Sequence, residues 1–163
     1  MKIILLDVDG VLNSDLWNEN HKKEKENGIL IDEEKVKLLS KLIKLTGAKI
    51  VLHSGWRFWF DENLSPIRKE SEILAKILKN NAIEIYDFTP DLTTEEIRKS
   101  GKFSLSKPKE ILLWLSGHSD ISTWVVIDDI VLNDETIQKH QIAPDSKIGL
   151  TYTDIENLRK FLE

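Results

Sequence analysis

Two aspartates, Asp7 and Asp9, directly follow a run of apolar residues near the start of the chain. Residues 3–6 are all isoleucine or leucine, which is typical of a strand buried on both faces. Because the aspartates are two positions apart, an extended chain directs both carboxylates to the same side, and Gly10 then allows a sharp change of direction. Adjacent carboxylates repel each other, and a bound divalent cation relieves that repulsion. Taken alone, the segment also fits a simple turn, since Asp and Gly are common turn residues.

Two other apolar segments of the chain also end at polar side chains. Residues 49–53 are followed by Ser54, and residues 124–127 are followed by Asp128 and Asp129. If these segments are parallel strands, their carboxyl ends lie at one edge of the sheet and the polar groups converge there. Carboxylate oxygens are ligands that Mg²⁺ favours together with substrate phosphate. A serine hydroxyl is able to donate a hydrogen bond to a phosphate oxygen. The three strand ends together therefore predict a magnesium and phosphate site.

Helices are expected between these strands. Asp32 is a suitable N-cap for an amphipathic helix that ends at Gly47, and the alternation of strands with helices predicts an α/β layered fold with parallel strands. The other elements that we expect are helices beginning at Pro66, at Pro108 and at Thr153 or Asp154, and strands at residues 83–86 and 148–150.

Two polar segments carry no element that the pattern supports. Residues 13–28 are expected to form only a short flap after the first strand, and residues 89–106 hold no clear helix or strand. Residues 63–106 leave room for a modest insertion at most, so no large cap domain is expected. A site without a cap is open, and an open site admits large substrates such as nucleic-acid ends or phosphoproteins.

The length and composition of the chain exclude several classes of protein and of site. A chain of 163 residues fits one domain, residues 1–163. The net charge of −5 argues against a broad electrostatic grip on nucleic acid. The absence of cysteine excludes disulfides, thiolate zinc sites and a cysteine nucleophile. Asp7 ends the first apolar run too early for a signal peptide, and no stretch approaches membrane-spanning length. We therefore expect a cytoplasmic protein with no membrane contact and no obligate protein partner.

The three polar strand ends, together with a lysine before a helix, resemble in the right order the four motifs of the haloacid dehalogenase-like (HAD) phosphohydrolase superfamily. More narrowly, the chain resembles the small HAD subfamily named for RNA-repair proteins. The segments that carry this likeness are residues 5–13, Ser54-Gly55-Trp56-Arg57, a lysine before a helix, Glu110-Ile111 with Trp114-Leu115, the segment ending in Asp128-Asp129, and Gly149-Leu150-Thr151. The resemblance implies a Rossmann-like parallel sheet flanked by helices, a Mg²⁺ cofactor and an aspartyl-phosphate intermediate.

The resemblance also implies a role for each motif. Asp7 becomes the nucleophile and a metal ligand, and Asp9 becomes the general acid and base, with its backbone carbonyl on the metal. Asp128 and Asp129 would anchor Mg²⁺; of the two, we expect Asp129 to be the direct ligand because it lies one step further past the strand. The residues implied to hold the phosphoryl group are Ser54, Gly55 and a lysine, for which Lys107 is preferred over Lys102 and Lys109.

Several residues near the motifs admit two interpretations. Arg57 is suited either to bidentate binding of a substrate phosphate or to a surface ion pair. His53, which stands where the family more often has a small residue, is expected to be a buried histidine with satisfied hydrogen bonds. The tryptophans Trp17, Trp56 and Trp59 fit core or lid packing better than stacking on a nucleobase.

Together these features predict a Mg²⁺-dependent phosphatase that hydrolyses a phosphomonoester, with a nucleotide or a nucleic-acid end among the expected substrates. The alternative is a non-catalytic phosphate-binding or regulatory module on a HAD scaffold. The presence of Asp9 speaks against that alternative, because a module that only binds phosphate has no need of a general acid.

Overall fold

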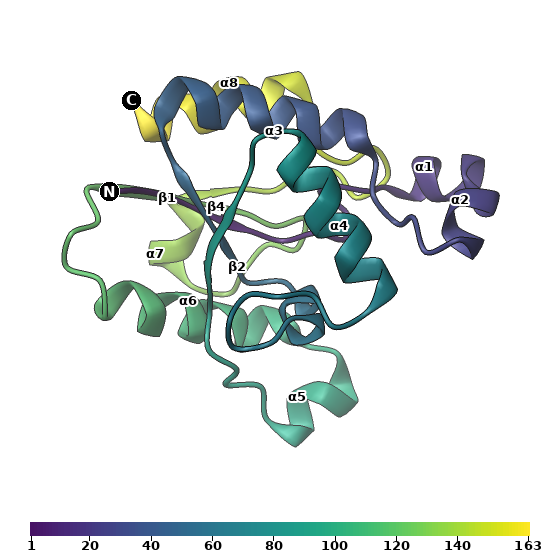
Figure 1. Ribbon diagram of the computed structural model, residues 1–163. Helices are drawn as coiled ribbons and strands as arrows, with labels where there is room; N and C mark the ends of the chain where they lie inside the picture. The colour runs from purple at the N-terminus through teal and green to yellow at the C-terminus, as the bar shows by residue number, and fades with distance from the viewer.

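The computed structural model describes residues 1–163 and shows a five-stranded parallel sheet with helices on both faces (Figure 1). The strands lie in the order β3-β2-β1-β4-β5, so β1 occupies the centre. Because every pairing is parallel, all five carboxyl ends lie along one edge. The α/β fold with a Rossmann-like parallel sheet is therefore confirmed. The strands are β1 (Lys2–Leu6), β2 (Lys49–Leu52), β3 (Ile85–Phe88), β4 (Thr123–Ile127) and β5 (Gln141–Ile142).

The register of the three central strands places their ends level with one another. Leu6 of β1 aligns with Leu52 of β2 and with Ile127 of β4. The pairing continues one step beyond, because the Asp7 amide donates to the Ile127 carbonyl at 2.9 Å and the His53 amide donates to the Leu6 carbonyl at 3.1 Å. The residues that follow the three strands therefore start from the same level, as the strand-end argument requires.

Helices cover the two faces of the sheet in separate layers (Figure 1). One layer shares a core with alternate residues of β1 and contains α3 (Glu33–Thr46), α4 (Lys69–Asn80) and α8 (Tyr152–Leu162). The opposite layer contains α6 (Lys107–Ser116) and α7 (Glu135–Gln138), which pack against Ile3 and Leu5. Since neighbouring β1 side chains enter opposite cores, both faces of this strand are buried, as its unbroken apolar run predicts.

Helix α3 follows from its sequence. The Asp32 carboxylate accepts a hydrogen bond from the Glu34 amide at 3.0 Å and so caps the first turn. Its buried face carries Val36, Leu39 and Leu42, at helical spacing. The helix ends at Gly47, as expected. The expected helix after Pro108 is also present, as α6.

The expected beginnings of two elements were wrong by two or three residues. Helix α4 begins at Lys69 and not at Pro66, because Pro66 forms an isolated antiparallel bridge with Phe60. Strand β3 begins at Ile85 and runs to Phe88, whereas residues 83–86 were expected. In both cases the apolar pattern identified the element but not its first residue.

The elements near the end of the chain differ more from those that the sequence predicts. No strand forms at residues 148–150; the Gly149 amide instead donates to the Asp145 carbonyl at 2.8 Å within a turn. The fifth strand is β5, which has only two residues and therefore no readable alternation. Helix α8 is capped by Thr151, whose hydroxyl accepts from the Asp154 amide, rather than by Thr153 or Asp154.

Short helices that the sequence did not predict lie beyond the carboxyl ends of the strands. They are α1 (Asp15–Asn20), α2 (Lys22–Glu26), α5 (Glu95–Ser100) and the 3-10 helices η1 (Gly55–Trp59) and η2 (Phe103–Leu105). Helices α1, α2 and α5 bury no side chain, so no apolar periodicity marks them. Local caps stabilise two of them: the Ser14 hydroxyl accepts from the Trp17 amide, and the Thr94 hydroxyl accepts from the Ile97 amide.

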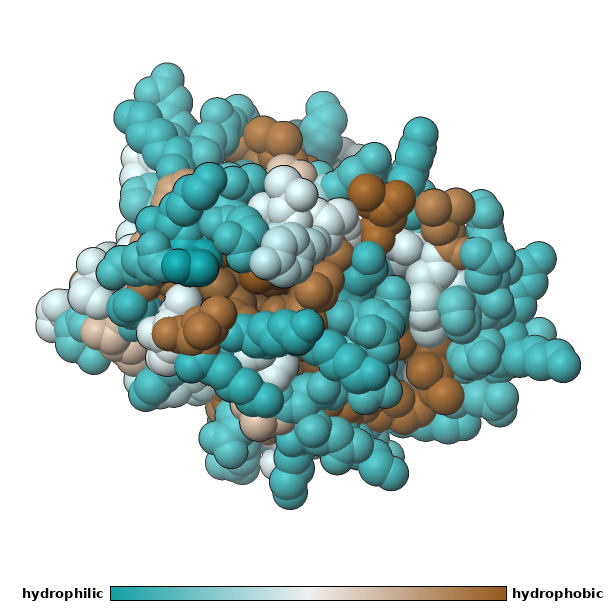
Figure 2. Space-filling model, turned by 90° about the horizontal axis from the view of Figure 1, so that it is seen from above, coloured by the Kyte–Doolittle hydropathy of each residue, from teal (hydrophilic) through white to brown (hydrophobic).

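The outer face of the layer that contains α3 and α8 is mostly polar. Figure 2, seen from above the layer that contains α3 and α8, shows hydrophilic side chains over most of this face, with apolar groups in smaller patches between them. No helix combines the length and the apolar character needed to cross a bilayer.

Candidate active site

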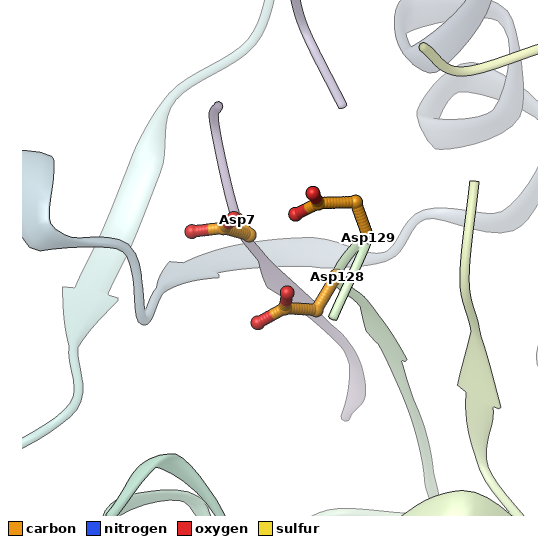
Figure 3. Close-up of side chains that lie close together, drawn as sticks. All are labelled: Asp7, Asp128 and Asp129. Atoms are coloured by element: carbon orange, nitrogen blue, oxygen red, sulfur yellow. The ribbon is translucent and has the colours of Figure 1, made fainter. Parts of the chain in front are cut away.

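Three aspartates meet at the carboxyl ends of β1 and β4. Asp7, Asp128 and Asp129 each place a carboxylate oxygen within 4.8 Å of the other two (Figure 3). Asp7 and Asp128 are buried and Asp129 is partly exposed. The strand register explains this arrangement, because Leu6 and Ile127 are paired and the next residue of each strand is an aspartate. The predicted convergence of the acidic strand ends is thus present.

Lys107 supplies a cation to this cluster. Its ammonium group lies 2.6 Å from Asp128 Oδ2 and 3.4 Å from Asp7 Oδ1, and the side chain is 12% exposed. Lys102 and Lys109 are exposed and make no contact with the cluster, so the geometry selects Lys107 among the three lysines. Burial lowers the pKa of Lys107, but Asp7 and Asp128 outweigh burial and hold that pKa above its ordinary value. Lys107 is therefore protonated at neutral pH.

Asp128 and Asp129 occupy different positions although they are adjacent in sequence. Asp128 has no exposed surface; its Oδ2 binds Lys107, and its Oδ1 accepts from the Ile130 amide at 2.9 Å. Asp129 lines the open cavity and has no ion pair. Asp129 is therefore the more available ligand, while Asp128 fixes the lysine.

Burial and like charge act together on Asp7. Burial, opposed by the charge of Lys107 and assisted by the neighbouring carboxylates of Asp128 and Asp9, raises the pKa of Asp7 from 3.8 to about 6. Burial, with a contribution from Asp7, also raises the pKa of Asp129. Three carboxylates face one ammonium group, so the cluster carries excess negative charge when its acids are ionised, and a divalent cation would neutralise it.

Gly10 makes room for the Asp129 carboxylate. The glycine has φ of +75°, and a Cβ built on it would lie 2.5 Å from Asp129 Cγ and Oδ2. Any side chain at this position would therefore displace the carboxylate. The turn after β1 thus allows Asp129 to approach the backbone beside Asp7, and the donors gathered there are all hard oxygens, as Mg²⁺ prefers.

Two hydrogen-bond donors, Asn13 and Trp56, hold the Asp9 carboxylate; we call this pair the Asp9 clamp. Asp9 Oδ1 accepts from Asn13 Nδ2 at 2.9 Å and its Oδ2 accepts from Trp56 Nε1 at 3.1 Å. The Asn13 amide group also accepts from the Gly10 backbone and donates to the Leu30 carbonyl, which fixes its orientation. Asp9 lines the same cavity as Asp7. Its side chain is held in place by two donors, and it is not part of the three-carboxylate cluster.

Ser54 and Gly55 begin the 3-10 helix after β2 and line the cavity. The Ser54 hydroxyl oxygen accepts from the Trp56 amide at 3.2 Å. Because a hydroxyl both accepts and donates, its proton remains available for an oxygen in the cavity. Ser54 is buried and Gly55 is exposed, so both stand at the boundary between the protein core and the open space.

Arg57 is buried, and its hydrogen bonds are used within the protein. An arginine has five N–H donors, and here five acceptors surround it at 3.0–3.4 Å. It binds Glu110 of α6 in an ion pair whose side chains are 6% and 1% exposed. The expected surface ion pair was wrong about exposure, and no donor is left over for a phosphate. The acceptors are the carbonyls of His53, Ser54, Thr89 and Pro90 and the Glu110 carboxylate.

His53 is buried beneath the cluster, as expected. Its Nε2 lies 3.5 Å from the Ile127 carbonyl and 3.7 Å from Asp128 Oδ2, but its Nδ1 has no hydrogen-bond partner. The expectation of a fully satisfied histidine is therefore wrong for one nitrogen. Burial, reinforced by the charge of Lys107, lowers the pKa of His53 well below its ordinary value, and the ring is neutral.

These groups open into one cavity of about 610 Å³. Asp7, Asp9, Ser54, Lys107 and Asp129 all line it, so the structure brings the predicted catalytic, phosphate-binding and metal residues to one space.

A scan against protein families now places the chain. The family model described as the HAD domain in Swiss Army Knife RNA repair proteins matches residues 3–155 of this chain. The chain belongs to this family. The predicted superfamily and subfamily are thereby confirmed, and membership supports a phosphohydrolase activity of the HAD type. No curated protein and no solved structure gave a significant match.

Three residues of this HAD site were not predicted to have the contacts they make. Asn13 and Trp56 bind Asp9, and Glu110 binds Arg57. The burial of Glu110 could have been predicted from the sequence, because this residue lies four positions before the apolar Trp114. A carboxylate at that position stands on the apolar face of α6 and requires a buried partner. Asn13 lies only four residues after Asp9, but the contact from Trp56 spans 47 residues and no local pattern specifies it.

Proposed function

We propose that this protein is a Mg²⁺-dependent phosphatase that hydrolyses a phosphomonoester through an aspartyl-phosphate on Asp7. The observation that carries the proposal is the position of Asp7: its carboxylate lines the cavity, lies 3.4 Å from the Lys107 ammonium and shares a cluster with Asp129. A carboxylate surrounded by these groups is suited to attack a phosphorus atom whose charge they neutralise.

The donor set fits Mg²⁺. Asp7 and Asp129 would hold the ion, while Asp128, tied to Lys107, supports the site from below. When bound, the ion would neutralise phosphate oxygens and align the phosphoryl group for attack. The same charge would relieve the repulsion that contributes to the raised pKa of Asp7.

The protein groups divide the reaction between them. Asp7 Oδ attacks the phosphorus atom and the bond from phosphorus to the leaving oxygen breaks, while Asp9 gives that oxygen a proton. Asp9 then removes a proton from water, which attacks the same phosphorus atom and releases inorganic phosphate and free Asp7. Lys107 and the Ser54 hydroxyl donate to the phosphoryl oxygens throughout. Asn13 and Trp56 hold Asp9 by the carboxylate that must exchange the proton.

The substrate is proposed to be a nucleotide or a nucleic-acid end. The description of the family as a domain of RNA repair proteins supports this choice, and so does the absence of a large cap over the cavity. The phosphorylated substrate is the only partner that the proposed reaction requires.

A non-catalytic phosphate-binding module on the same scaffold is the second candidate. The Asp9 clamp argues against it, because two side chains hold a carboxylate that phosphate binding does not need. Such a module would bind phosphate in the presence of Mg²⁺ without turning over any member of a broad substrate panel.

The proposed function is tested by release of phosphate from a generic aryl phosphate with Mg²⁺. We expect activity that disappears with EDTA and falls by at least about a thousandfold in Asp7→Asn. Asp15→Asn is the matched control, because it removes an exposed carboxylate from the rim of the same cavity. Activity that persists in Asp7→Asn would rule out the covalent mechanism, and an equal loss in both variants would point to a general charge effect.

A further inference from the structure

Two phenylalanine rings line the cavity without any role in phosphoryl transfer. Phe58 is 51% exposed and Phe103 is 39% exposed, and both border the cavity that contains Asp7 and Lys107. Exposed aromatic rings inside a cleft are typical of a binding surface, because their apolar faces become buried when a ligand enters. The tryptophans do not offer the same surface: Trp56 is buried with its Nε1 on Asp9, and neither Trp17 nor Trp59 borders the cavity.

Both rings are held by the elements that carry the phosphate-binding residues. Phe58 follows Ser54 by four residues in η1, and its ring centroid lies 4.4 Å from the guanidinium carbon of Arg57, which is itself fixed by its hydrogen bonds. Phe103 precedes Lys107 by four residues, and its carbonyl accepts from the Ser106 amide at 3.1 Å. The ring of Phe58 thus packs on a fixed guanidinium group, and the backbone that carries Phe103 is fixed by the turn before α6, which reduces the entropy cost of binding a ligand.

We propose that Phe58 and Phe103 form a subsite that stacks the base of a single nucleotide while its phosphate lies on Asp7 and Lys107. This inference rests on the proposed phosphatase function and names the residues that select its substrate. Stacking on an aromatic ring tolerates any base, because every base has a π-face. The subsite therefore selects nucleotides as a class over phosphates that lack a planar group.

The polar lining favours a nucleobase over a tyrosine ring as the occupant. Asn18, Ser14 and Ser146 border the same cavity and offer amide and hydroxyl groups. A nucleobase has donors and acceptors along its edge to pair with them, whereas the ring of a phosphotyrosine has none.

The charge of the cavity favours one nucleotide over a long strand. Arg57 and Lys107 are the only basic residues that border it, and both are already paired with carboxylates. Contact with several phosphates of a strand requires a row of free basic side chains. We therefore expect recognition of a mononucleotide, or of the terminal nucleotide of a chain.

The test compares two nucleotides with a phosphate that lacks a base, across matched variants. kcat/KM is measured for adenosine 3′- and 5′-monophosphates and for glycerol phosphate, in the wild type, Phe58→Ala, Phe103→Ala and Leu105→Ala. Leu105 is the control, because it is 41% exposed, lies in η2 with Phe103 and does not border the cavity. We expect each phenylalanine variant to lose about tenfold on the better nucleotide, with glycerol phosphate hydrolysis and the Leu105 variant little changed.

Three results would overturn the subsite. An equal loss on the nucleotides and on glycerol phosphate would show that the rings support the site as a whole, and no loss on the nucleotides would show that the rings bind nothing. A phosphotyrosine peptide that depends on the two rings more than the nucleotides do would replace the nucleobase by a tyrosine ring.

A direct binding measurement separates failure of this inference from failure of the proposed function. If the wild type hydrolyses none of these phosphates, the proposed phosphatase is contradicted. Calorimetric binding of adenosine 3′-monophosphate with Mg²⁺ then still tests the subsite. Weaker binding by Phe58→Ala and Phe103→Ala, with Leu105→Ala unchanged, supports it, and equal binding by all four proteins overturns it.

Discussion

The floor and the mouth of the cavity are built in different ways. The floor consists of Asp7 and Lys107, which line the cavity, and of the fully buried Asp128 behind them; these side chains extend from strand ends or the first turn of α6 and form mutual ion pairs. The mouth consists of Phe58 and Phe103, which stand on 3-10 turns and are exposed. A buried, rigid floor suits a reaction that depends on the position of charges. An exposed mouth suits selection of what is attached to the phosphate.

The Arg57–Glu110 ion pair joins these two regions. Arg57 holds the carbonyls that follow β2 and packs on Phe58, while Glu110 lies one turn after Lys107 in α6. Glu110 also accepts from the Leu92 amide, which anchors the segment before α5. Mutations in the floor should therefore lower the rate on every substrate, mutations in the mouth should change substrate preference, and mutations in the connecting pair should affect stability.

The largest effect on rate is expected for the floor. Lys107→Met should lower kcat by about a hundred- to a thousandfold on nucleotide and glycerol phosphate alike, because it removes a fixed cation from the phosphoryl group. Lys109→Met is the matched control, since Lys109 is exposed on the same helix. Steady-state kinetics with both substrates measures this. A loss confined to nucleotides would erase the distinction between floor and mouth.

The connecting pair is expected to show the largest effect on stability. Arg57→Met leaves the Glu110 carboxylate buried without its partner, and should lower the free energy of unfolding by about 3–5 kcal/mol. The Arg98–Asp91 pair provides the comparison, because Arg98 is 59% exposed and Arg98→Met should cost less than about 1 kcal/mol. Denaturation by urea measures both. Similar small losses in the two variants would mean that Arg57 is free to act elsewhere.

The double variant Arg57→Met with Glu110→Leu sharpens this test. Replacing both charges by apolar side chains removes the unpaired carboxylate, so part of the lost stability should return. If the double variant is less stable than Arg57→Met alone, the buried charge of Glu110 is not what destabilises the single variant.

A smaller effect is expected at the turn between the floor and the metal ligand. Gly10→Ala should lower Mg²⁺ affinity about tenfold, because the new Cβ would occupy the place of the Asp129 carboxylate. Gly47→Ala is the control: φ is +68° there, and a Cβ would meet nothing within 4 Å. Both substitutions should cost about 1 kcal/mol or more in stability for the left-handed backbone. Titration calorimetry with Mg²⁺ should separate them, and unchanged affinity in Gly10→Ala would remove Asp129 from the metal site.

The floor was more predictable from the sequence than the mouth. Each floor aspartate follows an uninterrupted apolar run, and parallel strands bring such ends together without any further information. The evidence that Lys107, and not Lys102 or Lys109, contacts the cluster came from the structure, because the sequence does not show which of three lysines near one helix start turns toward Asp7 and Asp128.

The rest of the site depends on contacts between distant segments. Helices α1 and α5 bury no side chain, so no periodicity revealed them. Arg57 was expected to bind a substrate phosphate or to form a surface ion pair, and its partner is a buried carboxylate 53 residues away in α6. The unpaired Nδ1 of His53, a fully buried residue, likewise could not be predicted from its neighbours in the sequence. Such contacts are set by tertiary packing, which local sequence patterns do not specify.

The central claim is that Asp7 carries the phosphoryl group during turnover. Quenching the working enzyme with borohydride tests this directly, because reduction converts an aspartyl phosphate to homoserine, which peptide mass spectrometry can locate. We predict homoserine at position 7 only when substrate and Mg²⁺ are both present, with Asp9, Asp128 and Asp129 unmodified. An enzyme that releases phosphate under these conditions with Asp7 intact, or with the modification at another residue, would contradict the account.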